Sequence, residues 1–204
     1  MRKIIMLIMS VLSIASLSAQ GTLNAEQVMD KARAKITGAK GISADFSYFG
    51  AGQNGKGSLK VAGQKFMVTL SDADIWYNGK DMYTYNKRTA ETTIMNPTAQ
   101  ELAEVNPLNY VKNSKELYTA SFSAEKKAGK YIVELTPKKK GEIKKVVLTL
   151  RSSDFVPEKI VVTPSTGSAL SVTVSSFKTL SSIAATEFEY PKTKYPKAEI
   201  VDLR

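Results

Sequence analysis

Two pairs of closely spaced carboxylates are the side chains whose type and spacing suit acid–base chemistry. They are Asp72 with Asp74 and Glu187 with Glu189. Two carboxyl groups that face each other across a cleft can cleave a glycosidic bond, one as the acid and the other as the base or nucleophile. The aspartates, however, fall in a predicted turn, and the glutamates flank Phe188 as the wet face of a predicted strand. Both pairs are therefore predicted to be solvated surface residues.

The sequence contains neither cysteine nor histidine. The lack of cysteine excludes disulfides, zinc–thiolate sites and thiol nucleophiles. The lack of histidine excludes imidazole metal ligands and the commonest general base. The sequence also has no glycine-rich loop of the kind that cradles phosphates. We therefore expect a monomer that is not an enzyme, with no catalytic residues, no metal site and no cofactor.

The first residues have the pattern of an export signal. Two basic residues precede an apolar run over residues 4–15, and Ala19 is a small residue at a suitable cut point. The run is too short to span a bilayer, which takes about 20 residues. A buried N-terminal helix is the alternative interpretation. We expect a signal peptide at residues 1–19, cleaved near Ala19, and a single domain at residues 20–204.

Positive charge is concentrated in two segments of the chain. The formal net charge is +10, and lysines cluster at residues 126–130 and 138–145. Such clusters can bind nucleic acid, but an exported protein rarely meets any, so we expect no nucleic-acid partner. We favour transient contact with an anionic membrane surface or an acidic partner, and simple solubility is the alternative.

Helix start signals are few and mark short segments. Asn24 with Gln27 forms a capping box before an amphipathic helix, and Thr98 with Glu101 forms another before a short one. Asn106 can cap a further short helix that begins at the next residue. The rest of the chain alternates apolar and polar residues with the period of a β-strand. A glycine-rich turn is predicted at residues 50–57, within the first hairpin. The segments that alternate with this period, and are therefore predicted strands, lie at residues 46–48, 59–61, 66–70, 75–77, 82–85, 91–96, 131–135, 146–150, 160–162, 170–174 and 188–190.

The Asn78–Gly79 dipeptide is the strongest hairpin signal in the sequence, because a two-residue type I′ turn needs positive φ at both central positions. Such a turn would pair Tyr77 with Lys80 and Trp76 with Asp81. Alternation then places apolar side chains on both faces of the hairpin, so the pattern alone does not decide which face points inward. One face carries Trp76, Tyr83 and Tyr85, and the other carries Ile75, Tyr77 and Met82.

So few helices cannot cover one face of a long sheet. The sheet must therefore curl, and the short helices can only plug its hollow. A curled sheet lined by aromatic side chains and closed by loosely held helices is suited to hold a hydrophobic guest. An ordinary filled barrel or sandwich, in which the aromatics are simply core, is the alternative.

Several segments also resemble a known family in their order and spacing. Residues 78–86 read Asn-Gly-Lys-Asp-Met-Tyr-Thr-Tyr-Asn, and residues 135–138 read Leu-Thr-Pro-Lys. Together with further pieces at residues 44–47, 57–61, 65–66, 188–191 and 201–202, they resemble the periplasmic outer-membrane lipoprotein carriers, the LolA family, over essentially the whole mature chain.

The resemblance implies a mainly β fold with some helix (α+β): an open, strongly curved antiparallel β half-barrel of about ten to eleven strands, closed by short lid helices. It implies a periplasmic carrier that binds the acyl chains of lipoproteins and shuttles them from the inner to the outer membrane. An inner-membrane release complex and an outer-membrane acceptor would be its partners. The alternatives are a sensor or interaction module of the same fold, and a carrier of another amphiphile such as a glycolipid or lipidic pigment.

On this reading the cavity and the lid have specific candidate residues. We assign the face with Trp76 to the inside and expect the lid residues to dip into the hollow when it is empty. The cavity candidates are Phe46, Tyr48, Leu59, Val61, Phe66, Val68, Trp76, Tyr83 and Tyr85, and the lid candidates are Leu102, Val105, Leu108 and Val111.

The chain departs from the family pattern at two places. Tyr48 stands where the family commonly has Gln, and Ala62-Gly63-Gln64 stands where it commonly has Arg-Pro before the third strand. That Arg is implicated in closing the lid of the family. We therefore expect mostly apolar contacts to hold the lid of this protein shut.

Overall fold

The computed structural model of the protein describes residues 23–204, and the expected signal peptide with its cleavage site lies outside the described residues. The helices and strands follow in chain order. They are α1 (Ala25–Thr37), β1 (Gly41–Gly50), β2 (Gln53–Ala62), β3 (Lys65–Leu70), β4 (Ala73–Tyr77), β5 (Met82–Asn86), β6 (Glu91–Met95), α2 (Ala99–Val105), α3 (Leu108–Lys112), α4 (Ser114–Leu117), β7 (Tyr118–Phe122), β8 (Lys130–Pro137), β9 (Ile143–Arg151), β10 (Pro157–Pro164), β11 (Leu170–Leu180) and β12 (Glu199–Asp202), with 3₁₀ turns η1 (Ala185–Phe188) and η2 (Lys192–Lys194) between the last two strands.

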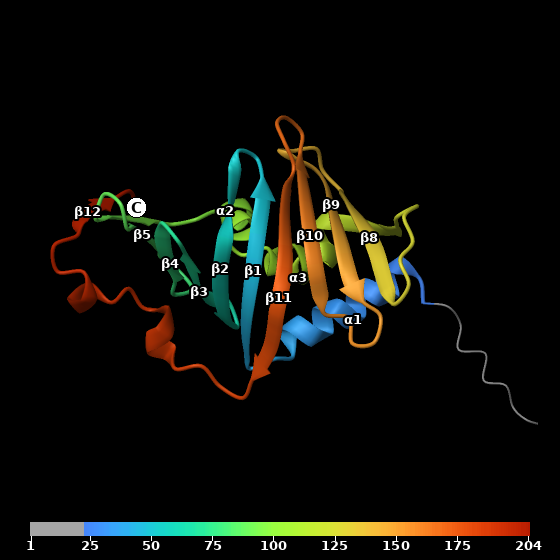
Figure 1. Ribbon diagram of the computed structural model, residues 1–204, viewed down its shortest axis with the longest axis horizontal. Helices are drawn as coiled ribbons and strands as arrows, with labels where there is room; N and C mark the ends of the chain where they lie inside the picture. The colour runs from blue at the N-terminus through green and yellow to red at the C-terminus, as the bar shows by residue number, and fades with distance from the viewer. Residues whose placement is uncertain (1–22) are drawn as a thin grey trace, which may run out of the picture.

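All twelve of these strands form one open, curved sheet (Figure 1). Its order is β12-β6-β5-β4-β3-β2-β1-β11-β10-β9-β8-β7, so the two edges are β12 and β7. Every pair is antiparallel except β12 with β6, which is parallel. The predicted open, curved and mainly antiparallel sheet is confirmed, with twelve strands in the described part of the chain instead of ten to eleven.

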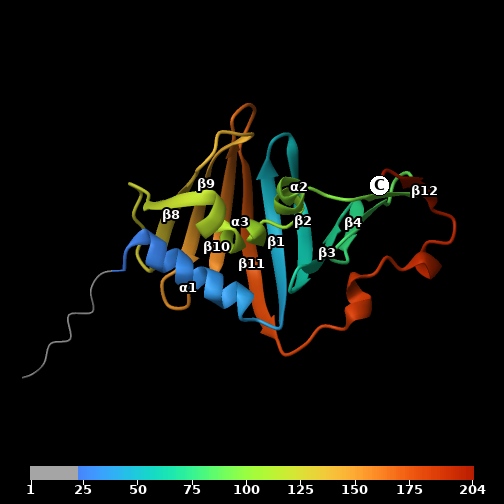
Figure 2. The same cartoon turned by 180° about the vertical axis from the view of Figure 1, so that it is seen from behind.

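The helices lie on the concave side of the sheet, where α1 and α3 cross β1 and β8–β11 (Figure 2). Both predicted capping boxes form: the side chain of Asn24 accepts from the Gln27 amide, and that of Thr98 accepts from the Glu101 amide. The Asn106 side chain accepts from the Leu108 amide, as expected of a cap. Helix α4 and strand β7 were not predicted from the sequence.

The predicted glycine-rich turn at residues 50–57 is wrong for most of its length. The turn is confined to the tip of the β1–β2 hairpin, and Gly55 and Gly57 belong to β2. They lie directly opposite Tyr48 and Phe46 in β1. A Cβ atom at Gly57 would lie 2.7 Å from the ring of Phe46, and one at Gly55 would lie 2.5 Å from the Tyr48 hydroxyl. Glycine is therefore a strand residue here because an aromatic ring from the neighbouring strand covers it.

The predicted two-residue hairpin at Asn78–Gly79 is also corrected by the structure. Tyr77 pairs with Met82 and Trp76 pairs with Tyr83, so the loop contains four residues. The Asn78 side chain closes it by accepting from the amides of Lys80 and Asp81. The register differs from the prediction by two residues, and since side chains alternate with period two, the predicted division into two faces still holds.

The end of the chain differs most from the sequence prediction. Residues 188–190 are not a strand: Phe188 ends a 3₁₀ turn and is buried. Residues 181–204, which we call the C-terminal arm, run from β11 back along the convex face and end as β12 beside β6 (Figure 1). The parallel pairing of β12 follows from this return path.

We predict that Gly57→Ala lowers the free energy of unfolding by about 1–3 kcal/mol, because the added methyl group would be overpacked against both a ring and a backbone oxygen. The Cβ atom would lie 2.7 Å from the Thr69 carbonyl oxygen, which cannot swing away. Urea denaturation measures the change. The control is Gly141→Ala, where nothing lies within 4 Å. Equal stabilities of the two variants would contradict the proposed packing of β1 on β2.

Candidate binding site beneath the helical lid

The concave face of the sheet carries a continuous apolar layer. Most of the predicted cavity residues belong to it, and they are contributed by three adjacent strands. From β1 come Phe46 and the partly buried Tyr48, from β2 Leu59 and Val61, and from β3 Phe66 and Val68. The layer continues through Ile75 and Met82 on one side and through Leu135, Val146, Leu148, Leu150 and Ile160 on the other.

Trp76, Tyr83 and Tyr85 do not line this face, and their assignment to the cavity is wrong. Val68 pairs with Ile75 and Phe66 with Tyr77, so the concave face of this hairpin is the one with Ile75, Tyr77 and Met82. The three excluded residues form an outer aromatic cluster with two tyrosines of the C-terminal arm. Its members are Trp76, Tyr83, Tyr85, Tyr190 and Tyr195.

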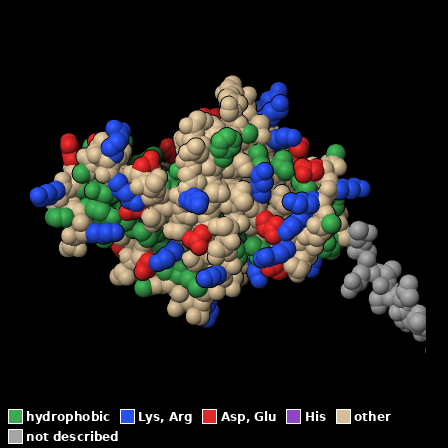
Figure 3. All heavy atoms as spheres, viewed as in Figure 1, with side chains coloured by type: hydrophobic (Ala, Val, Ile, Leu, Met, Phe, Trp, Pro, Cys, Tyr) green, Lys and Arg blue, Asp and Glu red, His purple; other side chains and the backbone are tan. Residues whose placement is uncertain are grey.

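The outer aromatic cluster is closely packed. Tyr190 stacks on Tyr83 at 5.4 Å and meets Trp76 edge-on at 5.5 Å, and Tyr195 stacks on Tyr85 at 4.0 Å. Hydrophobic side chains gather on the convex face over β4 and β5, at the left of Figure 3. Trp76 is 2% exposed because the arm covers it, and not because it faces the hollow.

Asp72 is exposed as predicted, and the other three carboxylates of the sequence pattern contact the C-terminal arm or belong to it. Asp74 was predicted to be solvated, but it is buried in β4, where it forms an ion pair with Lys87 at 2.8 Å and accepts from the Tyr195 hydroxyl at 2.9 Å. Glu187 forms an ion pair with Lys60 at 2.7 Å. These carboxylates anchor the arm to the convex face, and they do not face one another across a cleft.

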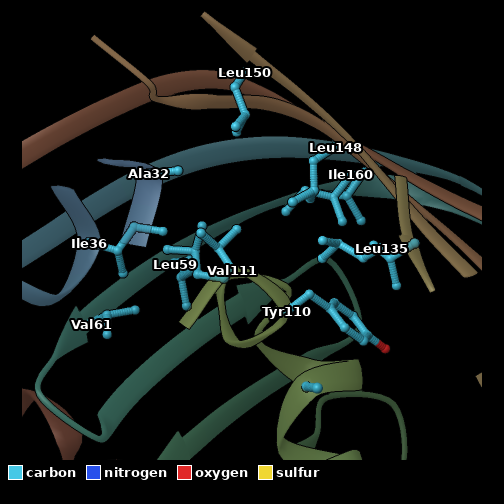
Figure 4. Packing of buried hydrophobic residues seen from close by; sticks show 14 of the residues in the cluster. Ala32, Ile36, Leu59, Val61, Tyr110, Val111, Leu135, Leu148, Leu150 and Ile160 are labelled. Carbon is cyan, nitrogen blue, oxygen red and sulfur yellow. The ribbon is translucent and has the colours of Figure 1, made fainter. Parts of the chain in front are cut away.

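We call helices α2, α3 and α4 together the lid. Its apolar residues Leu108 and Val111 are buried in the same core as the sheet residues. Leu102 and Val105 are partly buried and pack against its edge. Figure 4 shows Val111 among Leu59, Leu148 and Ile160, with side chains from both layers meeting. In this conformation the protein fills its hollow with its own side chains.

A polar contact also holds one end of the lid, which the sequence did not predict. The ammonium group of Lys112, at the end of α3, donates to the carbonyl oxygen of Gly63 at 2.9 Å and to the side-chain oxygen of Gln64 at 3.2 Å. Burial lowers the pKa of the Lys112 ammonium below its ordinary value. The cation thus comes from the lid and the acceptors from the β2–β3 turn, which is where the family pattern has its Arg.

The other end of the lid is tied to the loop between β8 and β9. Lys138 donates to the carbonyl oxygen of Lys115 in α4 at 2.7 Å. The side-chain amide of Gln100 in α2 donates to the carboxylate of Glu142. Helix α1 contributes a third contact, from Arg33 to the hydroxyl of Ser114 at 3.2 Å. The lid is therefore held by apolar contacts at its centre and by single polar contacts at its ends.

Two grooves flank the lid. The larger, which we call the mouth groove, has a volume of about 530 Å³ and lies between the lid and the β8–β9 loop. The smaller has a volume of about 200 Å³ and lies between α1, β1 and the β2–β3 turn, where Lys112 borders it. Each groove adjoins the apolar core at a place where the lid meets the sheet.

Residues 23–204 contain no group of three or more acidic side chains placed to hold a metal ion. In the same part of the chain no helix has both the length and the apolar character needed to cross a bilayer.

The chain belongs to the outer membrane lipoprotein carrier protein LolA family, whose sequence pattern matches residues 15–166. No curated protein matches the chain.

Two solved structures share the fold at low sequence identity. An uncharacterized conserved protein from Thermus thermophilus is 13% identical with a TM-score of 0.60, covering 87% of this chain and 98% of that one. A DUF1329 family protein from Desulfovibrio piger is 13% identical with a TM-score of 0.50, covering 83% and 98%. A LolA superfamily protein from Nitrosomonas europaea is 12% identical with a TM-score of 0.46, covering 83% and 99%.

We predict that Tyr190→Ala moves the fluorescence emission of Trp76, the single tryptophan, to longer wavelength, because water would reach the indole ring. The loss of its three aromatic contacts, with Trp76, Tyr83 and Tyr195, should also lower the free energy of unfolding by roughly 1–3 kcal/mol. Phe49→Ala is the control, since that ring is 72% exposed and contacts no member of the cluster. An unchanged emission in Tyr190→Ala would show that the arm does not cover Trp76 in solution.

We predict that Lys112→Met accelerates amide hydrogen exchange in α3, because the variant keeps the apolar stem but cannot donate to Gly63 and Gln64. A net hydrogen-bond contribution of about 0.5–1.5 kcal/mol corresponds to a roughly twofold to tenfold faster exchange. Lys115→Met is the matched control on the exposed side of α4. If the two variants exchange alike, the Lys112 contact does not hold the lid.

Proposed function

We propose that this protein is a periplasmic carrier that binds the acyl chains of lipoproteins beneath its lid and shuttles them from the inner to the outer membrane. Membership of the lipoprotein carrier family supports this proposal. So does the apolar concave face, which extends under a lid made of short helices. A release complex in the inner membrane and an acceptor in the outer membrane would be its partners, and binding without catalysis would be its activity.

The observation that carries the proposal is the filling of the hollow by the lid itself. Leu108 and Val111 occupy the space that a guest would need, and they are buried against the floor of the sheet. A guest can therefore enter only by displacing them. Guest and lid compete for one apolar surface. The net affinity for the guest is therefore reduced by the free energy of the lid contacts that must be broken.

This competition is what allows a carrier to release its guest. Each buried CH₂ group is worth about 0.8 kcal/mol, so one long acyl chain could gain on the order of 10 kcal/mol. Two or three chains in an empty, preformed cavity would approach the limit of non-covalent affinity near about −20 kcal/mol. Such a complex would not dissociate on a useful timescale. The three lid helices have 7, 5 and 4 residues and little stability of their own, so a guest can displace them. When the lid closes again, its burial offsets part of the free energy lost on release of the guest.

We predict that Leu108→Ala has two opposite effects. It should lower the free energy of unfolding of the empty protein by about 2–5 kcal/mol, because the side chain is buried and leaves a cavity. It should also tighten the affinity for an acylated ligand, because less lid contact must be given up. Denaturation and a fatty-acid binding titration measure the two quantities.

The control for this experiment is Ile132→Ala. Ile132 is buried on the convex face of β8, away from the lid, so the variant should lose stability without gaining affinity. If Leu108→Ala loses stability and affinity together, the lid helices are ordinary core and the carrier mechanism is wrong.

A further inference from the structure

We propose that the side-chain amide of Asn106 is a binding group for the guest, and that it donates a hydrogen bond to the carbonyl oxygen at the head of an acyl chain once the lid has moved. The inference rests on the proposed function and deepens it, because it names a chemical group, beyond the apolar chain itself, that the site would recognise.

Asn106 lies at the corner between α2 and α3 and is 0% exposed. The outer side of the lid faces solvent, so a lid residue without exposed surface lies on the inner side, where the lid packs towards the sheet. Its neighbours in the chain share this position: Val105 packs against the apolar core, and Leu108 is buried in it. Asn106 is thus enclosed on the side of the lid that faces the hollow.

The hydrogen bonds of Asn106 are complete except at the side-chain nitrogen. The backbone N–H donates to the carbonyl oxygen of Leu102 at 2.9 Å, and the backbone carbonyl accepts from the amide of Asn109 at 2.9 Å. The side-chain oxygen accepts from the amide of Leu108 at 3.2 Å. Within residues 23–204 the buried Nδ2 atom has no hydrogen-bond partner. Turning the side-chain amide over would not help, because the nitrogen would then face the Leu108 N–H.

Few buried side-chain atoms in the described part of the chain share this state. The others are two carboxylate oxygens and the Nε atom of Arg33. The carboxylate oxygens are acceptors and cannot serve a carbonyl group. Arg33 belongs to α1, and both of its terminal nitrogens already donate hydrogen bonds. Among these atoms of residues 23–204, the Nδ2 of Asn106 is therefore the one donor that belongs to the lid.

An acyl chain would bring a matching acceptor into the hollow. Every acyl group ends in a carbonyl, and burying that carbonyl without a donor costs free energy comparable to a lost hydrogen bond. In the closed lid the Nδ2 atom of Asn106 carries the same kind of cost. A hydrogen bond between the two would remove both costs and so favour the loaded protein over the empty one. Asn106 would thus select acyl chains over hydrocarbon chains that lack a carbonyl.

Two neutral lipids isolate this contact. They are monolauroylglycerol and dodecylglycerol, an ester and an ether that share the glycerol head and the chain length, and the ester carries a carbonyl where the ether carries a CH₂ group. Both must displace the same lid, so a change in lid stability alters the two affinities by the same factor and leaves their ratio unchanged. Calorimetry below the concentration at which each lipid aggregates measures the two Kd values. We expect the ester to bind the unmodified protein more tightly than the ether, although the ether is the more apolar.

The variant that tests the residue is Asn106→Leu, which roughly keeps the side-chain volume and removes the donor. The preference for the ester over the ether should fall about twofold to tenfold, the range expected for one hydrogen bond between neutral groups. Should this variant not fold, Asn106→Ser is the second one, because its hydroxyl can still cap α3 but ends one bond short of the amide nitrogen. It should show the same fall.

The matched control is Asn109→Leu. The side-chain amide of Asn109 belongs to the same lid but already donates to the carbonyl oxygen of Leu102 at 3.1 Å. This variant therefore alters the lid without removing an unpaired donor. Its preference for the ester should equal that of the unmodified protein, whatever happens to the two affinities themselves.

Three results would overturn the inference and leave the carrier function standing. One is tighter binding of the ether by the unmodified protein. Another is a preference for the ester that the substitutions at Asn106 leave unchanged. The third is an equal fall in Asn106→Leu and Asn109→Leu, which would mean that the shape of the lid sets the preference. If neither lipid binds the unmodified protein, the proposed function itself fails, and this inference fails with it.

Discussion

The concave face of the sheet presents a continuous layer of branched and aromatic side chains, and an open sheet cannot cover such a layer by closing on itself. Helices must therefore cover it, or water must. Burying this layer is worth roughly 25 cal/mol for each Å² of apolar surface, which makes it the dominant favourable term in folding. The rest of the structure follows from how this cover is divided among the helices.

The cover consists of a stable part and an exchangeable part. Helix α1 has 13 residues, a complete capping box and five buried residues, and it contacts α3, α4, β7 and β8. The lid helices are far shorter and each buries fewer side chains: α3 buries Leu108, Tyr110 and Val111, and α2 buries Ala103. Isolated helices of this length are marginal in water, so their position depends on tertiary contacts that a competing apolar chain can replace. The same layer that folds the protein is thus the layer offered to a guest.

Most of the strands, the helix caps and two of the three lid helices, α2 and α3, could be predicted from the sequence. Alternation at Phe46, Leu59 and Phe66 and the capping boxes at Asn24 and Thr98 are local signals, and the structure agrees with them. What could not be predicted depends on segments distant in the chain. Trp76 lies on a hairpin whose two faces are both apolar, so alternation does not show which face is concave. The face of Trp76 is the convex one, where Tyr190 and Tyr195 of the C-terminal arm pack on it.

The other differences from prediction have the same physical origin. Gly55 and Gly57 were predicted to be turn residues, because the sequence does not show that aromatic rings of β1 cover them. Asp74 was predicted to be a solvated turn residue, because its hydrogen-bond donor Tyr195 belongs to the C-terminal arm, far along the chain. No local signal marks the contact of Lys112, because its acceptors lie 48 and 49 positions earlier in the chain. Contacts of this kind carry no local periodicity. The prediction of the site was therefore correct for the cavity residues of β1, β2 and β3, wrong for those of β4 and β5, and incomplete for the lid.

The lid must leave the hollow before a guest can enter, and a reversible tether tests this requirement most directly. The protein contains no cysteine, so Gln64→Cys with Lys112→Cys introduces one thiol on each side of the contact that closes the lid. A short, reducible thiol–thiol cross-linker can then join the pair. Binding of a fatty-acid probe is measured before linking, after linking and after reduction. We predict that linking abolishes binding and that reduction restores it. Undiminished binding by the fully linked protein would contradict the account.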